Sequence, residues 1–443
     1  MAGASMKTHN SKAVAAERAA SQSQPTMPQD SPPPADRPAR LLDQRPYVFY
    51  WASRFLGGIG GQAQTVTIAW QVYTVARLHG DVRHASFALG MIGLAQFLPV
   101  AFLTLTAGET ADRHDRRLIG GLAMIGEALT VSGLLALSIV GLKAVWPIYG
   151  LAVVFGCCRA FLGPASSALA PMLVPRALLP KAIAWNSLAG QIGSIAGPVV
   201  GGLLVAVSPM ASYGVSLALY LLSAALLFAI SHPTKPVVQP GSRWTLVKEG
   251  LAYVWNNKIV FGAISLDLFA VLLGGATALL PAFAADILKV DAQGYGLLRA
   301  ATGAGAMMVA VILASRPLHR RAGIFMFCGV AVFGAATVVF GLSKSLWIST
   351  GALAILGGAD MLSVYVRQTL VQVVTPDAMR GRVSAVSGLF IGASNELGEF
   401  ESGVAARFLG PIGATVFGGV GALIVTGAWA AMFPALRKAD RLE

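Results

Sequence analysis

Long apolar runs separated by short polar stretches make up most of this sequence. A run of about 20 apolar residues is long enough to cross the hydrocarbon core of a bilayer as a helix. Twelve windows reach that length: 47–75, 85–107, 118–141, 146–172, 183–207, 212–231, 259–285, 295–314, 324–342, 346–372, 383–408 and 412–434. The pattern therefore predicts an all-α integral membrane protein with twelve transmembrane helices.

The composition supports the same class, because 55% of the residues are hydrophobic and only 12% are charged, against about 25% charged in soluble domains. The formal net charge of +13 is explained by Lys and Arg in cytoplasmic loops. We therefore expect no nucleic-acid partner. The three cysteines, Cys157, Cys158 and Cys328, have neither a CxxC nor a Cys/His metal spacing, so the sequence implies no disulfide framework and no metal site.

The two halves of the chain repeat one plan at a constant offset. The matched positions are Gly156 with Gly357, Pro175 with Pro376, Gly197 with Gly398 and Gly202 with Gly403. Charged positions are not kept, since Arg159 falls on Asp360 and Pro198 falls on Glu399. Such a repeat predicts two pseudo-symmetric six-helix bundles that share a scaffold and divide the chemistry between them.

The polar stretches divide the chain into five parts. We expect a disordered cytoplasmic tail at 1–44, a six-helix bundle at 45–231, a cytoplasmic linker at 232–258, a second six-helix bundle at 259–435 and a short cytoplasmic tail at 436–443. The linker contains Trp244, Val247, Leu251 and Val254 at helical spacing, which suits an amphipathic helix on the membrane surface. This helix is interpreted as a simple connection, with a regulatory role as the alternative.

Positive charges are distributed unequally between the two predicted membrane faces. Of the 33 Lys and Arg, 23 lie on the face of the N-terminal tail and 6 lie on the opposite face. Cytoplasmic loops retain an excess of Lys and Arg. Both termini are therefore predicted to be cytoplasmic, and the protein to span the plasma membrane.

The loop between the second and third windows reads GETADRHDRR. This loop resembles the G-x-x-x-D-R-x-G-R-R loop of the major facilitator superfamily, at Gly108, Asp112, Arg113, Arg116 and Arg117. Asp115 occupies the usual glycine position. The resemblance implies a cytoplasmic gate. In this gate the Asp of the motif, here Asp112, meets a helix N-terminus, and the arginines contact neighbouring helices. In the second half, Arg320 and Arg321 are interpreted as topology signals alone.

The fourth and fifth windows carry two further elements of the same superfamily. Arg159 with Gly163 resembles its R-x-x-x-G element, and an arginine at membrane depth costs about 2.5–3.5 kcal/mol on insertion scales, so it needs a partner or a wet cavity. A purely structural salt bridge is the alternative. The fifth window resembles the G-x-x-x-G-P-x-x-G-G signature of the superfamily's exporters, at Gly193, Gly197, Pro198, Gly201 and Gly202. We expect this stretch to bend at the contact between the bundles.

Three segments of the second half, at 266–288, 357–386 and 392–403, resemble the enterobactin-exporter-like, or transmembrane secretion effector, branch of this superfamily. The superfamily resemblance extends from Arg45 to Pro434. It implies the twelve-helix major facilitator fold and a monomer in a bacterial inner membrane. It also implies export of a small organic molecule, drug-like or siderophore-like.

Charged residues inside the windows are candidates for the substrate and proton pathway, because such residues are costly in a membrane. The candidates are Arg54, Glu127, Arg159, Asp267, Asp360, Arg367, Glu396, Glu399 and Glu401, and Glu127 is interpreted first as a structural acid. The resemblance implies that the first, fourth, seventh and tenth helices line a central cavity. Asp360 and Arg367 are two helical turns apart and share a face, and Glu396 shares a stripe with Glu399. We expect Arg159 to pair with Asp360, or Asp360 with Arg54, across the cavity.

The eleventh window holds three carboxylates, at Glu396, Glu399 and Glu401. Three ionised carboxylates in one membrane helix are severely costly, so some are expected to be protonated part of the time. A proton-coupled exporter requires this property. Glu399 is the first candidate for coupling, followed by Glu396 and Asp360. The alternative is that these glutamates only cap or bridge helices.

The sequence thus predicts a secondary active transporter that exports a small organic molecule by alternating access in exchange for protons. An importer or uniporter with the same fold and a non-transporting membrane sensor are the alternatives. The sequence contains no nucleotide-binding loop, HExxH motif or Ser/His/Asp set, so we expect neither an enzyme nor a cofactor.

Overall fold

The computed structural model describes residues 41–439 except 232–233, 235–242, 317 and 319. The predicted N-terminal tail lies outside the described residues up to residue 40, as do most of the linker ahead of residue 243 and the last part of the C-terminal tail at 440–443. Residues Leu41–Asp43 form a 3-10 helix, η1. Helical structure therefore begins before the predicted end of the tail at residue 44.

The described residues are almost entirely helical, with no strand among them. The N-terminal half contains α2 (Arg45–His79), α3 (Val82–Arg113), α4 (Arg116–Val140), α5 (Trp146–Leu169), η2 (Ala170–Met172), η3 (Arg176–Leu178), α6 (Leu179–Val207) and α7 (Pro209–Phe228). The C-terminal half contains α8 (Arg243–Asn256), α9 (Lys258–Leu273), η4 (Ala276–Leu279), α10 (Leu280–Ala282), η5 (Phe283–Ile287), α11 (Ala292–Ser315), α12 (Ala322–Leu342), α13 (Leu346–Val374), α14 (Asp377–Met432) and α15 (Pro434–Arg437). Each of the predicted windows lies largely within these elements.

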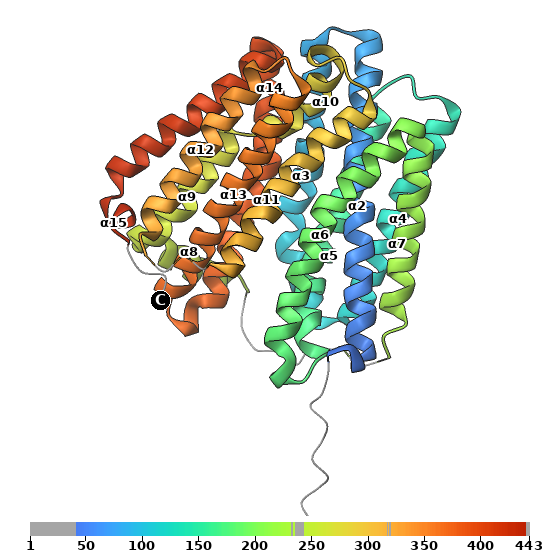
Figure 1. The fold of residues 1–443 in the computed structure, drawn as a ribbon. Coiled ribbons are helices and arrows are strands. Elements are labelled where there is room, and N and C mark those ends of the chain that lie inside the picture. The colour runs from blue at the N-terminus through green and yellow to red at the C-terminus, as the bar shows by residue number, and fades with distance from the viewer. Residues whose placement is uncertain (1–40, 232–233, 235–242, 317, 319, 440–443) are drawn as a thin grey trace, which may run out of the picture.

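α14 runs through the last two predicted windows, and Gly410 interrupts it. Gly410 has a φ of 75°, a left-handed conformation open to glycine, and Pro411 follows it. The chain therefore reverses, and α14 forms two helices that run in opposite directions (Figure 1). By length and composition, nine helices of the described residues could cross a membrane, with α14 counted once. α2 and α6 are not among the nine, and α6 contains only a shorter apolar stretch at Ala196–Val207.

The helix predicted for window 259–285 is broken near its middle. α9 ends at Leu273, Gly274 and Gly275 follow, and the chain continues as η4, α10 and the π-helix η5. A Cβ atom at Gly275 would lie 2.3 Å from the backbone oxygen of Gly398 in α14, so this close approach requires a glycine. Interrupted membrane helices commonly form binding sites in transporters.

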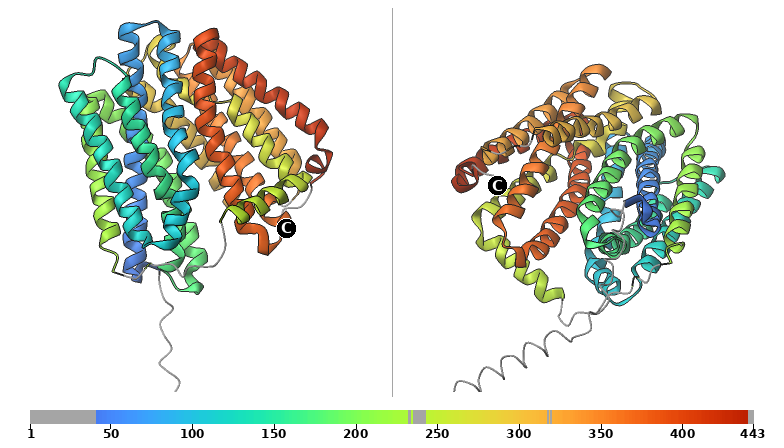
Figure 2. Two further views of the ribbon diagram at one scale, coloured as in Figure 1. Left: turned by 180° about the vertical axis from the view of Figure 1, so that it is seen from behind. Right: turned by 60° about the horizontal axis from the view of Figure 1, so that its bottom comes forward.

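The helices pack as two bundles with one main hydrophobic core each. Tyr50 and Tyr220 are buried in the N-terminal core, and Leu266 and Phe340 are buried in the C-terminal core. Two helix pairs make the most extensive contacts between the bundles, α3 with α14 and α6 with α11. Figure 2 shows α3 beside α14 from behind. The two-bundle helical architecture confirms the predicted fold class.

We call the membrane face where α2 begins the tail face and the face where α2 ends the far face. The bundles are in close contact near the far face: a Cβ atom at Gly202 would lie 2.4 Å from Cα of Gly296, and one at Gly403 would lie 2.5 Å from Cα of Gly90. Gly202 and Gly403 are equivalent in the repeat, so the two contacts are pseudo-symmetric. Toward the tail face the bundles diverge (Figure 1).

The linker helix α8 packs on the tail-face ends of α14 and α9. A Cβ atom at Gly250 would lie 2.9 Å from the backbone oxygen of Arg382, and Arg382 forms an ion pair of 2.6 Å with Glu249. Of the four apolar positions predicted for the membrane surface, Val254 is buried and Leu251 is exposed. The side chains of the other two lie outside the described part of the chain. α8 is therefore attached to the second bundle.

Candidate transport cavity

A cavity of about 650 Å³ lies between the two bundles. Helices of both bundles form its wall, chiefly α2, α3, α4 and α5 on one side and η4, α11, α13 and α14 on the other. The predicted residues that line it are Arg54, Arg116, Glu127, Arg159, Pro198, Asp360, Glu396 and Glu399. Because Arg116 begins α4 at the tail face, the cavity extends toward that face, where the bundles diverge.

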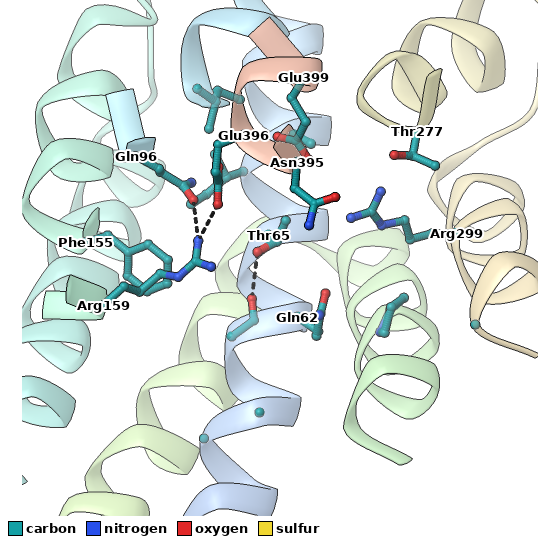
Figure 3. A pocket seen from close by; sticks show the side chains of 18 of the residues that line it. Gln62, Thr65, Gln96, Phe155, Arg159, Thr277, Arg299, Asn395, Glu396 and Glu399 are labelled. Carbon is teal, nitrogen blue, oxygen red and sulfur yellow. Dashed lines mark hydrogen bonds and ion pairs between the residues drawn. The ribbon is translucent and has the colours of Figure 1, made fainter. Parts of the chain in front are cut away.

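Arg159 of α5 reaches across the cavity to α14 (Figure 3). Its Nη1 donates hydrogen bonds to Oε1 of Glu396 at 3.0 Å and to Oε1 of Gln96 at 3.2 Å. The guanidinium carbon lies 5.9 Å from the ring centroid of Phe155. The Arg159 side chain is 44% exposed and that of Glu396 is 18% exposed, so the pair lies in the cavity. An ion pair between bundles can form and break as the bundles move.

The predicted ion pairs across the cavity were wrong. We expected Arg159 to pair with Asp360, or Asp360 with Arg54. Arg159 instead pairs with Glu396, and Nη1 of Arg54 donates to Oγ of Ser166 at 2.7 Å within the first bundle. Equivalence in a repeat predicts similar depth for two residues, but it does not bring them into contact.

Asp267 and Arg367 form a second ion pair inside the C-terminal bundle. Nη1 of Arg367 lies 3.1 Å from Oδ2 of Asp267, and the two side chains are only 2% and 5% exposed. Neither belongs to the cavity lining, although the sequence predicted both there. Asp360 does line the cavity, within electrostatic range of Asp267 and Arg367. Removing one partner of such a buried pair leaves the other charge uncompensated and is strongly destabilising.

The acidic stripe of α14 faces the cavity. Glu396 and Glu399 lie on one face of the helix, and both line the cavity (Figure 3). A Cβ atom at Gly93 of α3 would lie 3.0 Å from Cβ of Glu399, so α3 packs directly against this stripe. Glu401 does not line the cavity and accepts a hydrogen bond from Ser402 at 3.5 Å. The helical spacing thus separates the two cavity carboxylates from the third.

Arg299 of α11 faces the acidic stripe from the opposite wall (Figure 3). Its charge acts on Glu399, but among the described residues it makes no hydrogen bond and no ion pair. The polar side chains of Gln62, Thr277 and Asn395 line the same part of the cavity. Arg299 is not among the predicted candidates, although it is the only charged residue of window 295–314. That isolated charge is the signal that identifies it.

The predicted gate residues lie at the tail-face ends of α3 and α4. Asp112 pairs with Arg116 at 3.5 Å, and Nε of Arg116 donates to the backbone oxygen of Ala111 at 3.1 Å. Gly108 lies within α3, and Arg113 is exposed at its end. Arg116 is the member of this set that lines the cavity.

Asp115 has the helix-capping role that was expected of Asp112. Its Oδ1 accepts a hydrogen bond of 3.1 Å from the backbone nitrogen of Arg117, and its Oδ2 lies 3.0 Å from Nε of Arg117. It also accepts a hydrogen bond from the hydroxyl of Thr234, and Arg117 donates to the backbone oxygen of Ile230. Burial alone raises the pKa of Asp115, but the hydrogen bonds from Thr234 and Arg117 outweigh burial and lower the pKa below its ordinary value.

The glycines of the predicted exporter signature contact two different helices. A Cβ atom at Gly197 or Gly201 would lie 2.4 or 2.8 Å from an atom of α2, and Gly193 also faces α2. These three glycines therefore pack α6 inside the first bundle. Gly202 faces α11 of the other bundle, and Pro198 lines the cavity. The sequence placed the entire stretch between the bundles, whereas one glycine of the stretch lies there.

Comparison with known proteins finds similarity over most of the chain. A family model described as transmembrane secretion effector matches residues 39–443. The uncharacterized MFS-type transporter YfiS of Bacillus subtilis is 27% identical over 343 residues, which cover 74% of this chain and 80% of YfiS. The enterobactin exporter EntS of Escherichia coli O139:H28 is 28% identical over 324 residues, which cover 72% of this chain and 73% of EntS.

Among solved structures, a bacterial homologue of the human lysosomal transporter Spinster has a similar fold. Its crystal structure is inward-facing and unoccupied, with a TM-score of 0.66 at 14% identity. The match covers 89% of this chain and 96% of that chain. At this identity the likeness shows the fold alone.

Proposed function

We propose, on the premise that this chain belongs to the transmembrane secretion effector family, that it exports a small organic molecule in exchange for protons. The chain is a multi-pass integral membrane transporter of the major facilitator superfamily. The relative EntS is an enterobactin exporter, which supports a drug-like or siderophore-like substrate for this chain. The exchange with protons and the identity of the coupling residues are our own proposals.

The proposal is supported by a charged cavity between two bundles whose closest described contacts lie near one face. The contacts of Gly202 with Gly296 and of Gly90 with Gly403 close the far face. The cavity extends toward the tail face. Rocking one bundle against the other around such a cavity alternates access between the two faces. We assign this structure to the state that loads substrate from the tail face.

Protons are proposed to move on carboxylates that face the cavity without a cation in contact. Glu399 and Asp360 both line the cavity, and neither forms an ion pair with another described residue. Carboxylates inside transporters commonly serve as proton relays because their neutral form is stable at membrane depth. Glu399 is the first candidate, because it lies beside the Arg159–Glu396 pair that joins the bundles.

Arg299 is proposed to contact the substrate. Its guanidinium offers five N–H donors, and no described protein group accepts from them. The carboxylate of Glu399 lies across the cavity from it (Figure 3). A substrate group that accepts from Arg299 and donates to Glu399 fits this site. A proton on Glu399 removes its negative charge and turns one of its oxygens into a hydrogen-bond donor. Substrate binding is then weakened, so proton and substrate compete, as antiport requires.

The tail face is proposed to be cytoplasmic, because 23 of the 33 Lys and Arg lie on that side. Both termini are then inside the cell. We further propose that the chain acts as a monomer in a bacterial inner membrane. The bundles are proposed to correspond to residues 45–231 and 259–435, joined by the linker at 232–258.

A vesicle assay tests this function. A substrate is first identified by comparing the growth of cells with and without the protein on a panel of antibiotics and siderophores. Everted vesicles that contain the protein should then accumulate that compound when their interior is made acidic. An importer or uniporter would show no accumulation driven by the pH gradient. A sensor would show no protein-dependent flux of any compound.

A further inference from the structure

Three side chains connect the two bundles at the far face. Nε and Nη2 of Arg77, near the end of α2, donate to Oδ2 and Oδ1 of Asp286 at 3.1 and 2.9 Å. The hydroxyl of Tyr73, one turn earlier on α2, donates to Oδ2 of the same carboxylate. Nη1 of Arg77 also donates to the backbone oxygen of Gly80 at 2.9 Å, which fixes the guanidinium. One carboxylate of the C-terminal bundle is therefore held by three donors of the N-terminal bundle.

The segment that carries Asp286 is itself unusual. Asp286 lies in the π-helix η5, at the end of the broken seventh membrane helix, and π-helical turns occur frequently at functional sites. Ala282, just before η5, is fully buried in the core of the N-terminal bundle, although it belongs to the C-terminal half. This segment must leave that core whenever the far face opens.

The position of the contact makes its opening unavoidable during transport. α2 and the broken helix of α9 to η5 are equivalent first helices of the two halves, and they meet at the far face. Substrate that enters from the tail face can leave only when these helices separate. The Arg77 and Asp286 side chains are 35% and 25% exposed, so water can solvate both charges once they part.

We propose that Arg77, Tyr73 and Asp286 form a latch that holds the far face closed while substrate loads and that breaks to release it. The latch rests on the proposed function for its place in the export cycle, but its effect on access can be measured without a substrate. These three are positioning residues, because they change the equilibrium between the state open to the tail face and the state open to the far face. The bidentate geometry gives the latch a defined closed position.

Access to the cavity from each face tests the latch. The three native cysteines are replaced by serine, and Thr65→Cys supplies a reporter thiol in the cavity wall. A membrane-impermeant maleimide is applied to right-side-out and to everted vesicles. Labelling is normalised to a second protein that carries Lys143→Cys, an exposed far-face residue. Arg83→Gln is the matched control, because Arg83 is an exposed far-face arginine outside the latch.

With the latch intact, the reporter should label rapidly from the tail face and slowly from the far face. Asp286→Asn and Arg77→Gln should each raise far-face labelling roughly 3- to 10-fold, since a tenfold change corresponds to about 1.4 kcal/mol. Tyr73→Phe should give a smaller rise. The double variant Arg77→Asp with Asp286→Arg should return labelling toward the original rate, which a merely structural role of either residue would not produce.

Far-face labelling that is the same for Asp286→Asn, Arg77→Gln and Arg83→Gln would overturn the latch. Should a single variant fail to reach the membrane, Tyr73→Phe and the charge-swap variant give the same comparison. If Thr65→Cys in the protein with an intact latch labels faster from outside the cell, the assigned orientation is wrong. The effect of the latch variants is then read as labelling from the cytoplasmic side. If the variants change far-face labelling as expected but the original protein shows no proton-driven export, the proposed function is wrong and the latch stands.

Discussion

Arg159 and Glu396 join the two bundles across the cavity through an ion pair of 3.0 Å. Arg159 is the repeat equivalent of Asp360, yet its partner comes from the helix that carries Glu399. A charge of one bundle is thereby connected to the acidic stripe of the other. Any change of charge on that stripe alters the attraction between the bundles.

Breaking this pair should slow export. Arg159→Gln and Glu396→Gln should each lower the export rate at least tenfold, which corresponds to about 1.4 kcal/mol, because each leaves a charge in the cavity without its partner. The charge-swap variant Arg159→Glu with Glu396→Arg should recover part of the rate. The measurement is substrate efflux from preloaded cells at equal protein levels. If the single variants export at the normal rate, the ion pair has no role in export.

Neighbouring glycines of α6 should have different effects when enlarged. Gly202→Leu should prevent closure of the far face, because a Cβ atom there would lie 2.4 Å from Cα of Gly296. It should raise labelling of a cavity cysteine from the far face. Gly201→Leu should instead lower the melting temperature, since Gly201 packs on α2 of the same bundle, and overpacking costs about 1–3 kcal/mol. Identical effects of both variants would contradict the two assigned contacts.

Most of the fold could be predicted from the apolar pattern, because window length and repeat symmetry depend on local sequence. The break at Gly410 falls in the gap between the last two windows. The interruption at Gly274 and Gly275 was not predicted, since an apolar run gives no sign of a broken helix. At the break, Gly275 packs against Gly398, a residue distant in the chain.

The candidate site was only partly predictable. Spacing along one helix placed Glu396 and Glu399 on one stripe, because helical periodicity fixes that relationship. Partners on different helices do not follow from spacing, so the actual partner of Arg159 was missed. The capping role of Asp115 was not predicted, because Asp115 occupies a position where the motif usually has glycine. Its burial and its bond to Thr234 depend on tertiary packing.

Asp115 should stabilise the tail-face end of α4 in a pH-dependent manner. Its folded-state pKa is lowered by Thr234 and Arg117 in spite of burial, so its contribution is present above the ordinary pKa of 3.8 and is lost as the pH falls through the lower folded value. Asp115→Ala should cost about 1 kcal/mol at pH 7, as expected for loss of an N-cap. The cost should shrink below about pH 4. Melting in detergent checks this.

Asp112→Ala is the control for that experiment. The Asp112 side chain is 41% exposed and its pair with Arg116 is long, at 3.5 Å. We expect a change within about 0.5 kcal/mol. An equal loss of stability for both variants would contradict the assignment of Asp115 as the cap.

Substitutions of Arg299 and Arg367 should have different effects, the first on substrate binding and the second on stability. Arg299→Gln should raise the KM for export about tenfold, or about 1.4 kcal/mol of binding, and leave the melting temperature unchanged, because no described residue loses a partner. Arg367→Gln should lower stability by about 3–5 kcal/mol, because Asp267 is left buried and unpaired. KM from vesicle uptake and melting in detergent give the comparison. A destabilised Arg299→Gln protein with unchanged KM would refute the proposed substrate contact.

Proton coupling through Glu399 is the central claim, and proton movement driven by substrate measures it most directly. Everted vesicles are acidified inside, and the pH gradient is followed with a fluorescent weak base while substrate is added outside. The original protein should discharge the gradient on addition of substrate. Glu399→Gln should leave the gradient intact while still binding substrate, whereas Glu401→Gln, outside the cavity, should behave like the original protein. Discharge by Glu399→Gln at the original rate would contradict the account and shift the coupling role to Asp360.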